Sequence, residues 1–205
     1  MKYFVFDIDG TLIDTAAVDR QAFRQALLDA GYDFAPEQLH FAFGMPGRPA
    51  LRQLGVAEAD IEDIVAQWEK LAYARLNEVP VYDGIVPLLE KLHAAGAKCG
   101  IVTSRTRSQL ERGFSPLGLD HLFDTIVCAD EVEHPKPAPD EMIECLRRLG
   151  GTAEQAIFVG DSVYDMQCAA SAGVTSGLAL WGCHEPEKMQ ADHRFAHPSE
   201  IASLL

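Results

Sequence analysis

The sequence has few basic residues, with 17 Lys and Arg against 31 Asp and Glu and a formal net charge of −14. Proteins that bind nucleic acid or anionic membranes need clustered lysines and arginines to contact phosphate groups. We therefore expect no nucleic-acid partner and no membrane partner. A solvated acidic surface would account for most of the negative charge, and a cation site would account for part of it.

The sequence also lacks the patterns of a disulfide framework and of a zinc site. Its five cysteines are odd in number and scattered, and no two of them have CxxC spacing. We interpret them as reduced, mostly buried thiols. No apolar run approaches the ~18 residues of a membrane helix, and Asp7 interrupts the first apolar run too early for a signal peptide. The expected location is cytoplasmic.

The chain has 205 residues, of which 48% are hydrophobic, enough for one core with an inserted subdomain. Residues 15–80 show helical spacing only, with helices expected at 16–30, after Pro36, near Pro49 and at 59–78. From residue 81 onward, strands and helices alternate. The expected strands are 98–104, 125–129, 156–160 and 176–181, and the expected helices are 85–95, 107–114, 139–149 and 163–172, with a loop-rich tail and a short helix from Ser199.

Strands separated by single helices predict an α/β fold with a parallel sheet that is covered by helices on both faces. We assign residues 1–14 and 81–205 to this core and residues 15–80 to an inserted helical subdomain. In a parallel sheet the carboxyl ends of the strands meet at one edge, which is where open α/β folds bind ligands.

The first strand, at residues 2–6, ends in Asp7-Ile-Asp9-Gly10-Thr11. Asp7 and Asp9 are two residues apart, so in extended backbone both side chains point the same way and are able to share a cation. Gly10 lets the main chain leave the strand sharply and approach a ligand closely. The alternative for this stretch alone is an ordinary Asp-Gly turn.

Other polar residues follow the later strands. Thr103 and Ser104 end one strand, Asp161 follows another with Asp165 after it, and Lys136 lies among prolines in a stiff loop. Carboxylates, a hydroxyl and an amine at one sheet edge suit phosphoryl transfer through a carboxylate nucleophile. Oxygen ligands of this kind fit Mg²⁺, which would neutralise charge during the transfer.

With these residues the chain resembles the haloacid dehalogenase-like hydrolase superfamily, and most closely its phosphoglycolate phosphatase-like branch. The four motifs stand in order: Asp7-Ile-Asp9-Gly10-Thr11, Ile101-Val-Thr103, Lys136 in His-Pro-Lys-Pro-Ala-Pro-Asp, and Gly160-Asp161-Ser-Val-Tyr-Asp165. The resemblance spans nearly the whole chain. It implies a Rossmann-like core with an inserted all-helical cap at residues 15–80.

The resemblance also implies a role for each motif residue. Asp7 would be the nucleophile and a metal ligand, and Asp9 would be the general acid/base whose carbonyl also binds the metal. Thr103 and Lys136 would bind the phosphoryl group, and Gly10 and Ser104 would contact substrate. The remaining metal ligand would be Asp161, and Asp165 would support the site by orienting Lys136 or a metal-bound water.

A cap of this kind closes over the active site and selects the leaving group. The Gly/Pro-rich stretch from Gly44 to Pro49 carries one cation, Arg48, which we expect to contact an anionic substrate. The alternative is an exposed arginine beside a helix start. Arg105, directly after Ser104, has the same two interpretations.

The expected function is that of a Mg²⁺-dependent phosphatase of a small phosphorylated metabolite, acting through an aspartyl-phosphate. The alternative is a β-phosphoglucomutase-like isomerase, but Asp19 stands where such mutases carry a cap histidine, and they lack the acid at Asp165. A non-catalytic binding protein with the same fold is a third possibility. Asp9 and Gly10 disfavour a dehalogenase. The sequence leaves open the substrate and whether the chain is a monomer or a homodimer.

Overall fold

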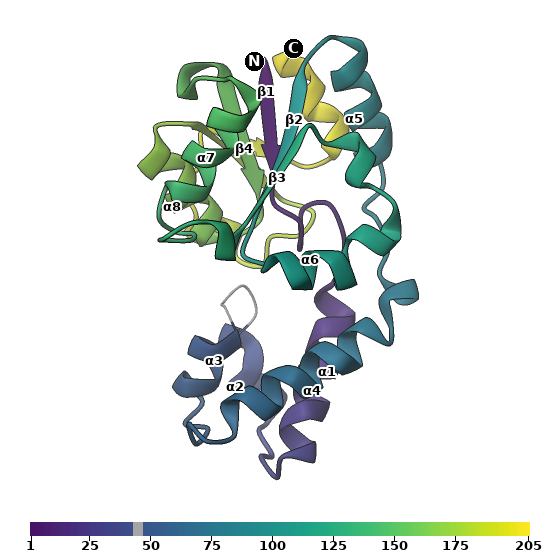
Figure 1. Cartoon of the computed structure of the whole chain (residues 1–205), viewed down its shortest axis with the longest axis vertical. Coiled ribbons are helices and arrows are strands. Elements are labelled where there is room, and N and C mark those ends of the chain that lie inside the picture. The colour runs from purple at the N-terminus through teal and green to yellow at the C-terminus, as the bar shows by residue number, and fades with distance from the viewer. Residues whose placement is uncertain (43–46) are drawn as a thin grey trace. The chain divides into compact units, whose positions relative to one another are not determined.

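The computed structural model describes residues 1–42 and 47–205, which form two compact units. One unit combines Met1–Asp14 with Val81–Leu205 and holds the sheet. The other is Thr15–Pro80, and its described residues form helices and loops (Figure 1).

The larger unit is built on a six-stranded sheet in the order β3-β2-β1-β4-β5-β6, and every neighbouring pair is parallel. The strands are β1 (Tyr3–Phe6), β2 (Lys98–Thr103), β3 (Thr125–Cys128), β4 (Ala156–Gly160), β5 (Thr175–Ala179) and β6 (His193–Phe195). The first strand of the chain is central, with Phe6 opposite both Ile101 of β2 and Val159 of β4. This is the parallel α/β fold that the sequence predicts.

Helices cover both faces of this sheet (Figure 1). The helices of this unit are α5 (Ile85–Ala94), α6 (Arg107–Gly113), α7 (Asp140–Leu149) and α8 (Val163–Ala172), and α5, α7 and α8 pack on strands. Helices α7 and α8 pack on one face, where Val5, Phe158 and Cys145 share a buried cluster. Helix α5 packs on the other face together with the 3₁₀ segment Pro198–Leu204. Because β1 is buried on both faces, its residues are apolar without alternation.

The smaller unit contains α1 (Ala16–Asp29), α2 (Pro36–Leu39), α3 (Gly47–Gln53) and α4 (Ile61–Tyr73). Helices α1 and α4 pack against each other along apolar stripes of helical spacing. Their contact includes Phe23 and Trp68, whose ring centroids are 4.7 Å apart. The unit therefore has a hydrophobic core of its own, as an independent subdomain requires.

Short 3₁₀ segments connect these elements. They are η1 (His40–Ala42), η2 (Leu76–Glu78), η3 (Ser115–Leu117), η4 (Asp120–Leu122), η5 (Ala129–Glu131), η6 (Ala153–Gln155), η7 (Pro186–Lys188) and η8 (Pro198–Leu204).

The structure corrects the expected elements in three places. The tail, expected to be loops, contains the edge strand β6, whose three residues are too few to produce a recognisable pattern. The helix expected at 59–78 ends at Tyr73, and Leu76–Glu78 is a separate 3₁₀ segment. The C-terminal helix is a 3₁₀ segment. Gly44 to Pro46, part of the predicted cap loop, lie outside the described residues.

The cysteines lie in the packed interior as expected. Cys99, Cys128, Cys145 and Cys168 are buried and Cys183 is partly buried, and all five are free thiols. Burial raises the pKa of Cys99, Cys145 and Cys168 to about 12, so these thiols stay protonated and unreactive. Within the described part of the chain, no helix has the length and apolarity needed to span a bilayer.

Candidate active site

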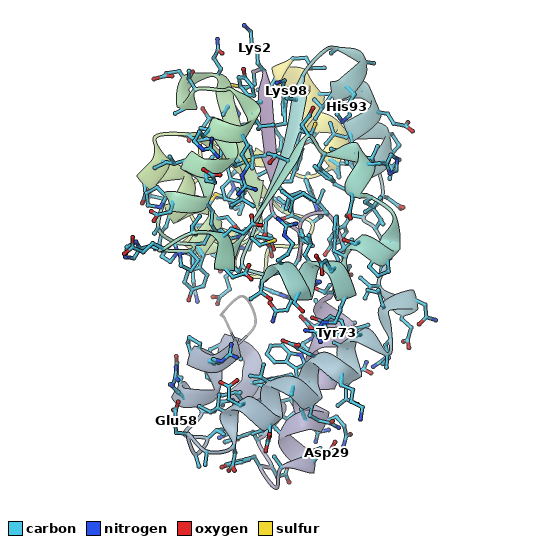
Figure 2. The ribbon with its side chains drawn as sticks, in the orientation of Figure 1. Lys2, Asp29, Glu58, Tyr73, His93 and Lys98 are labelled. Atoms are coloured by element: carbon cyan, nitrogen blue, oxygen red, sulfur yellow. The ribbon has the colours of Figure 1, made fainter. Side chains whose placement is uncertain are left out.

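The predicted site residues of the larger unit follow its central strands. Asp7 comes directly after β1, and its backbone N–H continues the ladder to β4 by donating to the carbonyl of Val159 at 2.9 Å. Lys2 and Lys98 mark the opposite end of β1 and β2, near the N-terminus (Figure 2). The chain turns back after Asp7, and the carbonyl of Ile8 accepts the N–H groups of residues 11–13. Asp7 is therefore fixed at the carboxyl edge of the sheet and is only 7% exposed.

Gly10 lets this turn pass close to Asp161. Its φ of +77° is a conformation that disfavours side chains, and a Cβ at this position would lie 2.2 Å from Oδ2 of Asp161. Thr11 donates from Oγ1 to Oδ1 of Asp161 at 3.4 Å. The glycine of the first motif thus makes room for the aspartate of the last motif.

Lys136 binds two aspartates, Asp7 directly after β1 and Asp165 in the first turn of α8. Its Nζ lies 2.8 Å from Oδ1 of Asp7 and 2.7 Å from Oδ1 of Asp165. All three side chains are largely or fully withdrawn from solvent, with exposures of 3% for Lys136, 11% for Asp7 and 0% for Asp165. Since a buried charge needs partners, this triad has a fixed arrangement.

Asp165 also holds the start of helix α8. Its Oδ2 accepts from the backbone N–H of Ser162 at 3.0 Å and from Ser162 Oγ at 2.6 Å, while Ser162 Oγ accepts from the N–H of Asp165. This reciprocal capping fixes the first turn of α8. A Cβ at Gly160 would lie 2.4 Å from Asp165, so the close approach needs glycine there. Asp165 therefore links Lys136 to the start of the helix.

Three carboxylates gather closely enough to bind one cation. Oxygens of Asp7, Asp161 and Asp165 all lie within 4.8 Å of one another. Burial, opposed by the charge of Lys136 and reinforced by the charges of Asp165 and Asp9, raises the pKa of Asp7 to about 7. Burial, followed by Asp165 and Asp7, also holds the pKa of Asp161 well above its usual value. The three carboxylates thus carry more negative charge than the ammonium group of Lys136 can balance.

Lys136 is held in its charged form by the same cluster. Burial alone would lower the pKa of Lys136, but the carboxylates of Asp165 and Asp7 outweigh burial and raise it well above the usual lysine value. The ammonium group is thus charged at any pH at which the protein is folded and active.

The end of β2 brings Thr103 and Arg105 to the same sheet edge. Thr103 is buried, and its Oγ1 accepts from the backbone N–H of Arg105 at 3.3 Å. The guanidinium of Arg105 binds both oxygens of Asp9, at 2.8 and 2.6 Å. Ser104 is exposed. The sequence offered Arg105 either as a contact with an anionic substrate or as an exposed arginine beside a helix start, and no local pattern indicates its pairing with Asp9, 96 residues away.

Glu141 is a second residue that the sequence analysis missed. It is fully buried, and its Oε2 accepts a 2.6 Å hydrogen bond from the backbone N–H of Lys136. Burial raises the pKa of Glu141 to about 7, while the charge of Lys136 opposes the shift. In the sequence it follows Asp140 at the start of a helix, where acidic residues are common for a different reason, the helix dipole.

Arg48 lies in the helical unit and pairs with an acid of that unit. It belongs to the first turn of α3, and its Nε and Nη2 lie 2.7 and 2.8 Å from the two carboxylate oxygens of Glu62. Both side chains are well exposed, at 51% and 68%. A contact between Arg48 and substrate stays a prediction, as do the substrate contacts of Gly10 and Ser104.

Comparison of the sequence with known proteins points to one family. The family model of the haloacid dehalogenase-like hydrolases matches residues 4–179. Pyrophosphatase PpaX of Bacillus cereus is 30% identical over 181 residues, which cover 86% of this chain and 82% of that protein.

Solved structures agree with the sequence comparison. A provisionally assigned phosphoglycolate phosphatase from Lactobacillus plantarum is 32% identical, with a TM-score of 0.91 over 100% of this chain and 99% of that one. A hydrolase from Pseudomonas syringae is 25% identical, with a TM-score of 0.85 over 98% and 96% of the two chains. Both the sequence and the structure thus support one assignment: the chain belongs to the haloacid dehalogenase-like hydrolase family, as a hydrolase of the phosphatase type.

Proposed function

We propose that this protein is a Mg²⁺-dependent phosphatase that hydrolyses a small phosphorylated metabolite through an aspartyl-phosphate on Asp7. The observation that carries the proposal is the buried contact of Asp7 with Lys136, beside the oxygen cluster of Asp7, Asp161 and Asp165. A carboxylate nucleophile, a fixed ammonium and a place for a cation lie together at one strand end. The similarity to a pyrophosphatase and to a provisionally assigned phosphoglycolate phosphatase supports the same reaction class.

The acidic cluster fits a hard divalent cation. All its donors are oxygens, which Mg²⁺ prefers, and the raised pKa values of Asp7 and Asp161 follow from burial and mutual repulsion, which a cation would relieve. Asp7, Asp161 and the backbone carbonyl of Asp9 would hold the ion. When bound, it would neutralise negative charge on the phosphoryl group and on the attacking carboxylate. Asp165 is less suited as a ligand because both its oxygens already accept hydrogen bonds.

The chain's own residues divide the remaining work. Asp7 attacks phosphorus, and the bond to the leaving group breaks as Asp9 gives that group a proton. Water, losing a proton to Asp9, then cleaves the aspartyl-phosphate and returns Asp7 as a carboxylate. Thr103 and Lys136 bind phosphoryl oxygens, and Asp165 keeps the Lys136 ammonium in place. In this proposal the helical unit acts as a cap that limits access of bulk solvent while one water molecule reacts.

The first experiment measures phosphate release from a panel of phosphorylated metabolites with Mg²⁺ and with EDTA. The panel includes 2-phosphoglycolate, inorganic pyrophosphate and β-glucose 1-phosphate, with conversion of the last to glucose 6-phosphate followed separately. Asp7→Asn removes the nucleophile, and Asp33→Asn, an exposed aspartate in the helical unit, serves as the matched control.

Metal-dependent release that Asp7→Asn abolishes and Asp33→Asn retains is the expected result. Isomerisation of the sugar phosphate without release would replace the phosphatase by a mutase. Release that survives Asp7→Asn would overturn the covalent mechanism. No turnover by the wild-type protein on any member of the panel would leave the family assignment intact but count against the proposed activity.

A further inference from the structure

Arg105 and Asp9 form a two-point ion pair beside the ends of β1 and β2. Arg105 Nε lies 2.8 Å from Asp9 Oδ2, and Arg105 Nη2 lies 2.6 Å from Asp9 Oδ1. One planar guanidinium thus engages both oxygens of the carboxylate, an arrangement that is strong and directional. The residue proposed to exchange protons with the substrate is therefore held by a cation.

This pair is more accessible than the Lys136–Asp7 pair at the same sheet edge. The side chains of Arg105 and Asp9 are 16% and 35% exposed. Those of Lys136 and Asp7 are 3% and 11% exposed. A partner for the guanidinium can thus arrive from solution without displacing buried groups.

The main chain fixes the point from which the guanidinium extends. The backbone N–H of Arg105 donates to Thr103 Oγ1 at 3.3 Å, and its carbonyl accepts from the N–H of Ala129 at 3.0 Å. These bonds tie Arg105 to the ends of β2 and β3. A change of ion-pair partner therefore requires only rotation of the Arg105 side chain, next to the threonine assigned to the phosphoryl group.

Proton exchange by Asp9 conflicts with this arrangement. To protonate a leaving group, Asp9 must turn one oxygen toward it, and both oxygens are engaged by Arg105. The pair must therefore open during the reaction. Opening is costly unless the guanidinium gains another anion, because a charged donor that loses its partner is strongly destabilised.

We propose that the substrate supplies this anion, and that Arg105 selects phosphoryl compounds whose leaving group carries a second negative charge. A carboxylate or phosphate on the leaving group would replace Asp9 on the guanidinium and release Asp9 for proton transfer. The inference rests on the proposed phosphatase function and specifies its substrate class. The net reaction stays simple hydrolysis: the P–O bond to the leaving group breaks, water supplies the new P–O bond, and the leaving oxygen gains a proton.

The test compares substrates whose leaving group does or does not carry a second anionic group. 2-Phosphoglycolate is paired with its amide, 2-phosphoglycolamide, and inorganic pyrophosphate is paired with methyl phosphate. Values of kcat and KM are measured with Mg²⁺ for the wild type, Arg105→Gln and Arg105→Lys. Arg107→Gln is the matched control, since Arg107 lies two residues further on and pairs with Glu131.

The wild type should prefer the charged member of at least one pair by roughly 10- to 100-fold in kcat/KM, the worth of a charge-assisted hydrogen bond. Arg105→Gln should bring that preference close to one by raising KM for the charged substrate more than KM for the neutral substrate. Arg105→Lys should retain part of the preference, and Arg107→Gln all of it. The substrate pair whose preference Arg105→Gln removes shows whether the second anion is a carboxylate or a phosphate.

Binding supplies a readout that does not depend on turnover. Both members of each pair are titrated by calorimetry into proteins that carry Asp7→Asn. Adding Arg105→Gln should raise Kd for 2-phosphoglycolate or pyrophosphate and leave Kd for the other member of the same pair unchanged.

If a folded Arg105→Gln variant lost kcat/KM equally for charged and neutral substrates, Arg105 would have only a structural role and the inference would be overturned. A wild-type enzyme that treats both members of each pair alike would also overturn it. In either case phosphate release by the wild type would leave the proposed phosphatase standing. Absence of release from every compound would instead remove the proposed function, and the inference with it.

Discussion

The backbone N–H of Lys136 donates a 2.6 Å hydrogen bond to the buried carboxylate of Glu141, five residues further along the chain. The Nζ of the same lysine binds Asp7 and Asp165. Glu141 thus holds the main chain of the residue whose side chain holds the proposed nucleophile. Its other oxygen, Oε1, is buried with no hydrogen-bond partner among the described residues. This buried carboxylate, with one oxygen bonded and the other not, leads to the first prediction.

Glu141→Gln should become more stable relative to wild type as the pH rises. The folded protein raises the pKa of Glu141 to about 7, above its value in an unfolded chain, so the native state binds the extra proton between those two values. The contribution of Glu141 to stability therefore falls as the pH rises through this window, and glutamine has no proton to lose. Urea unfolding of both proteins at about pH 5 and about pH 8 measures the effect. A difference between the two proteins that does not change with pH would contradict it.

Asp7→Asn should lose at least about 10³-fold in turnover, the scale expected when a covalent nucleophile is removed. In EDTA the variant should nevertheless melt no lower than wild type. Burial raises the pKa of Asp7 to about 7, so ionising Asp7 costs the folded protein stability as the pH rises through that value, and asparagine avoids the cost. Lys136 keeps Asp165 as its partner in the variant. Calorimetric scans in EDTA at about pH 8 compare the melting temperatures of the two proteins. A lower melting temperature for the variant would contradict the prediction.

Gly10→Ala should reduce both activity and stability, whereas Gly96→Ala should reduce stability alone. Both glycines have similar φ values, +77° and +76°, so both substitutions add backbone strain of about 1 kcal/mol. Only at Gly10 does the added Cβ meet Asp161, at 2.2 Å, whereas nothing lies within 4 Å of a Cβ at Gly96. Urea unfolding and the dependence of turnover on Mg²⁺ concentration separate the two effects. Equal turnover in both variants would count against a role for the Gly10–Asp161 approach.

Arg48→Ala tests the predicted substrate contact of the helical unit. If Arg48 binds an anionic substrate, the variant should raise KM severalfold with little change in melting temperature, because exposed ion pairs contribute little to stability. Glu62→Gln is the matched variant, since it frees the same guanidinium without removing it, and it should leave KM unchanged or lower it. An unchanged KM in Arg48→Ala would reduce this residue to a surface partner of Glu62.

The parallel sheet and its helices could be predicted from the sequence because their signals are local. Buried strands such as Ala156–Gly160 are continuous apolar runs, and helices such as Val163–Ala172 end at a glycine. The edge strand His193–Phe195 gives no such signal, because three residues with one buried apolar side chain do not make a pattern. The pattern also failed to show where α4 ends. Apolar residues keep helical spacing beyond Tyr73, although the helix stops there and a 3₁₀ segment follows.

At the site, the sequence indicated which residues share an edge but not how they pair. Parallel topology brings Asp7, Thr103 and Asp161 together, since each follows a strand. The bond of Arg105 to Asp9 and that of Glu141 to Lys136 depend on side-chain direction and burial, which spacing along the chain does not encode. The roles assigned to these residues stay predictions until the variants are measured.

The order of the strands has a consequence for how the protein is made. The nucleophile follows β1, at residues 3–6, but β1 lies between β2, at residues 98–103, and β4, at residues 156–160. During synthesis β1 therefore has no neighbour until β2 is made and gains its second neighbour only with β4, while Thr15–Pro80 already has the local contacts to fold. The active site therefore forms late, although Asp7 precedes the other proposed site residues in the sequence. A nascent chain stalled before β4 should thus have a folded helical unit but no phosphatase activity.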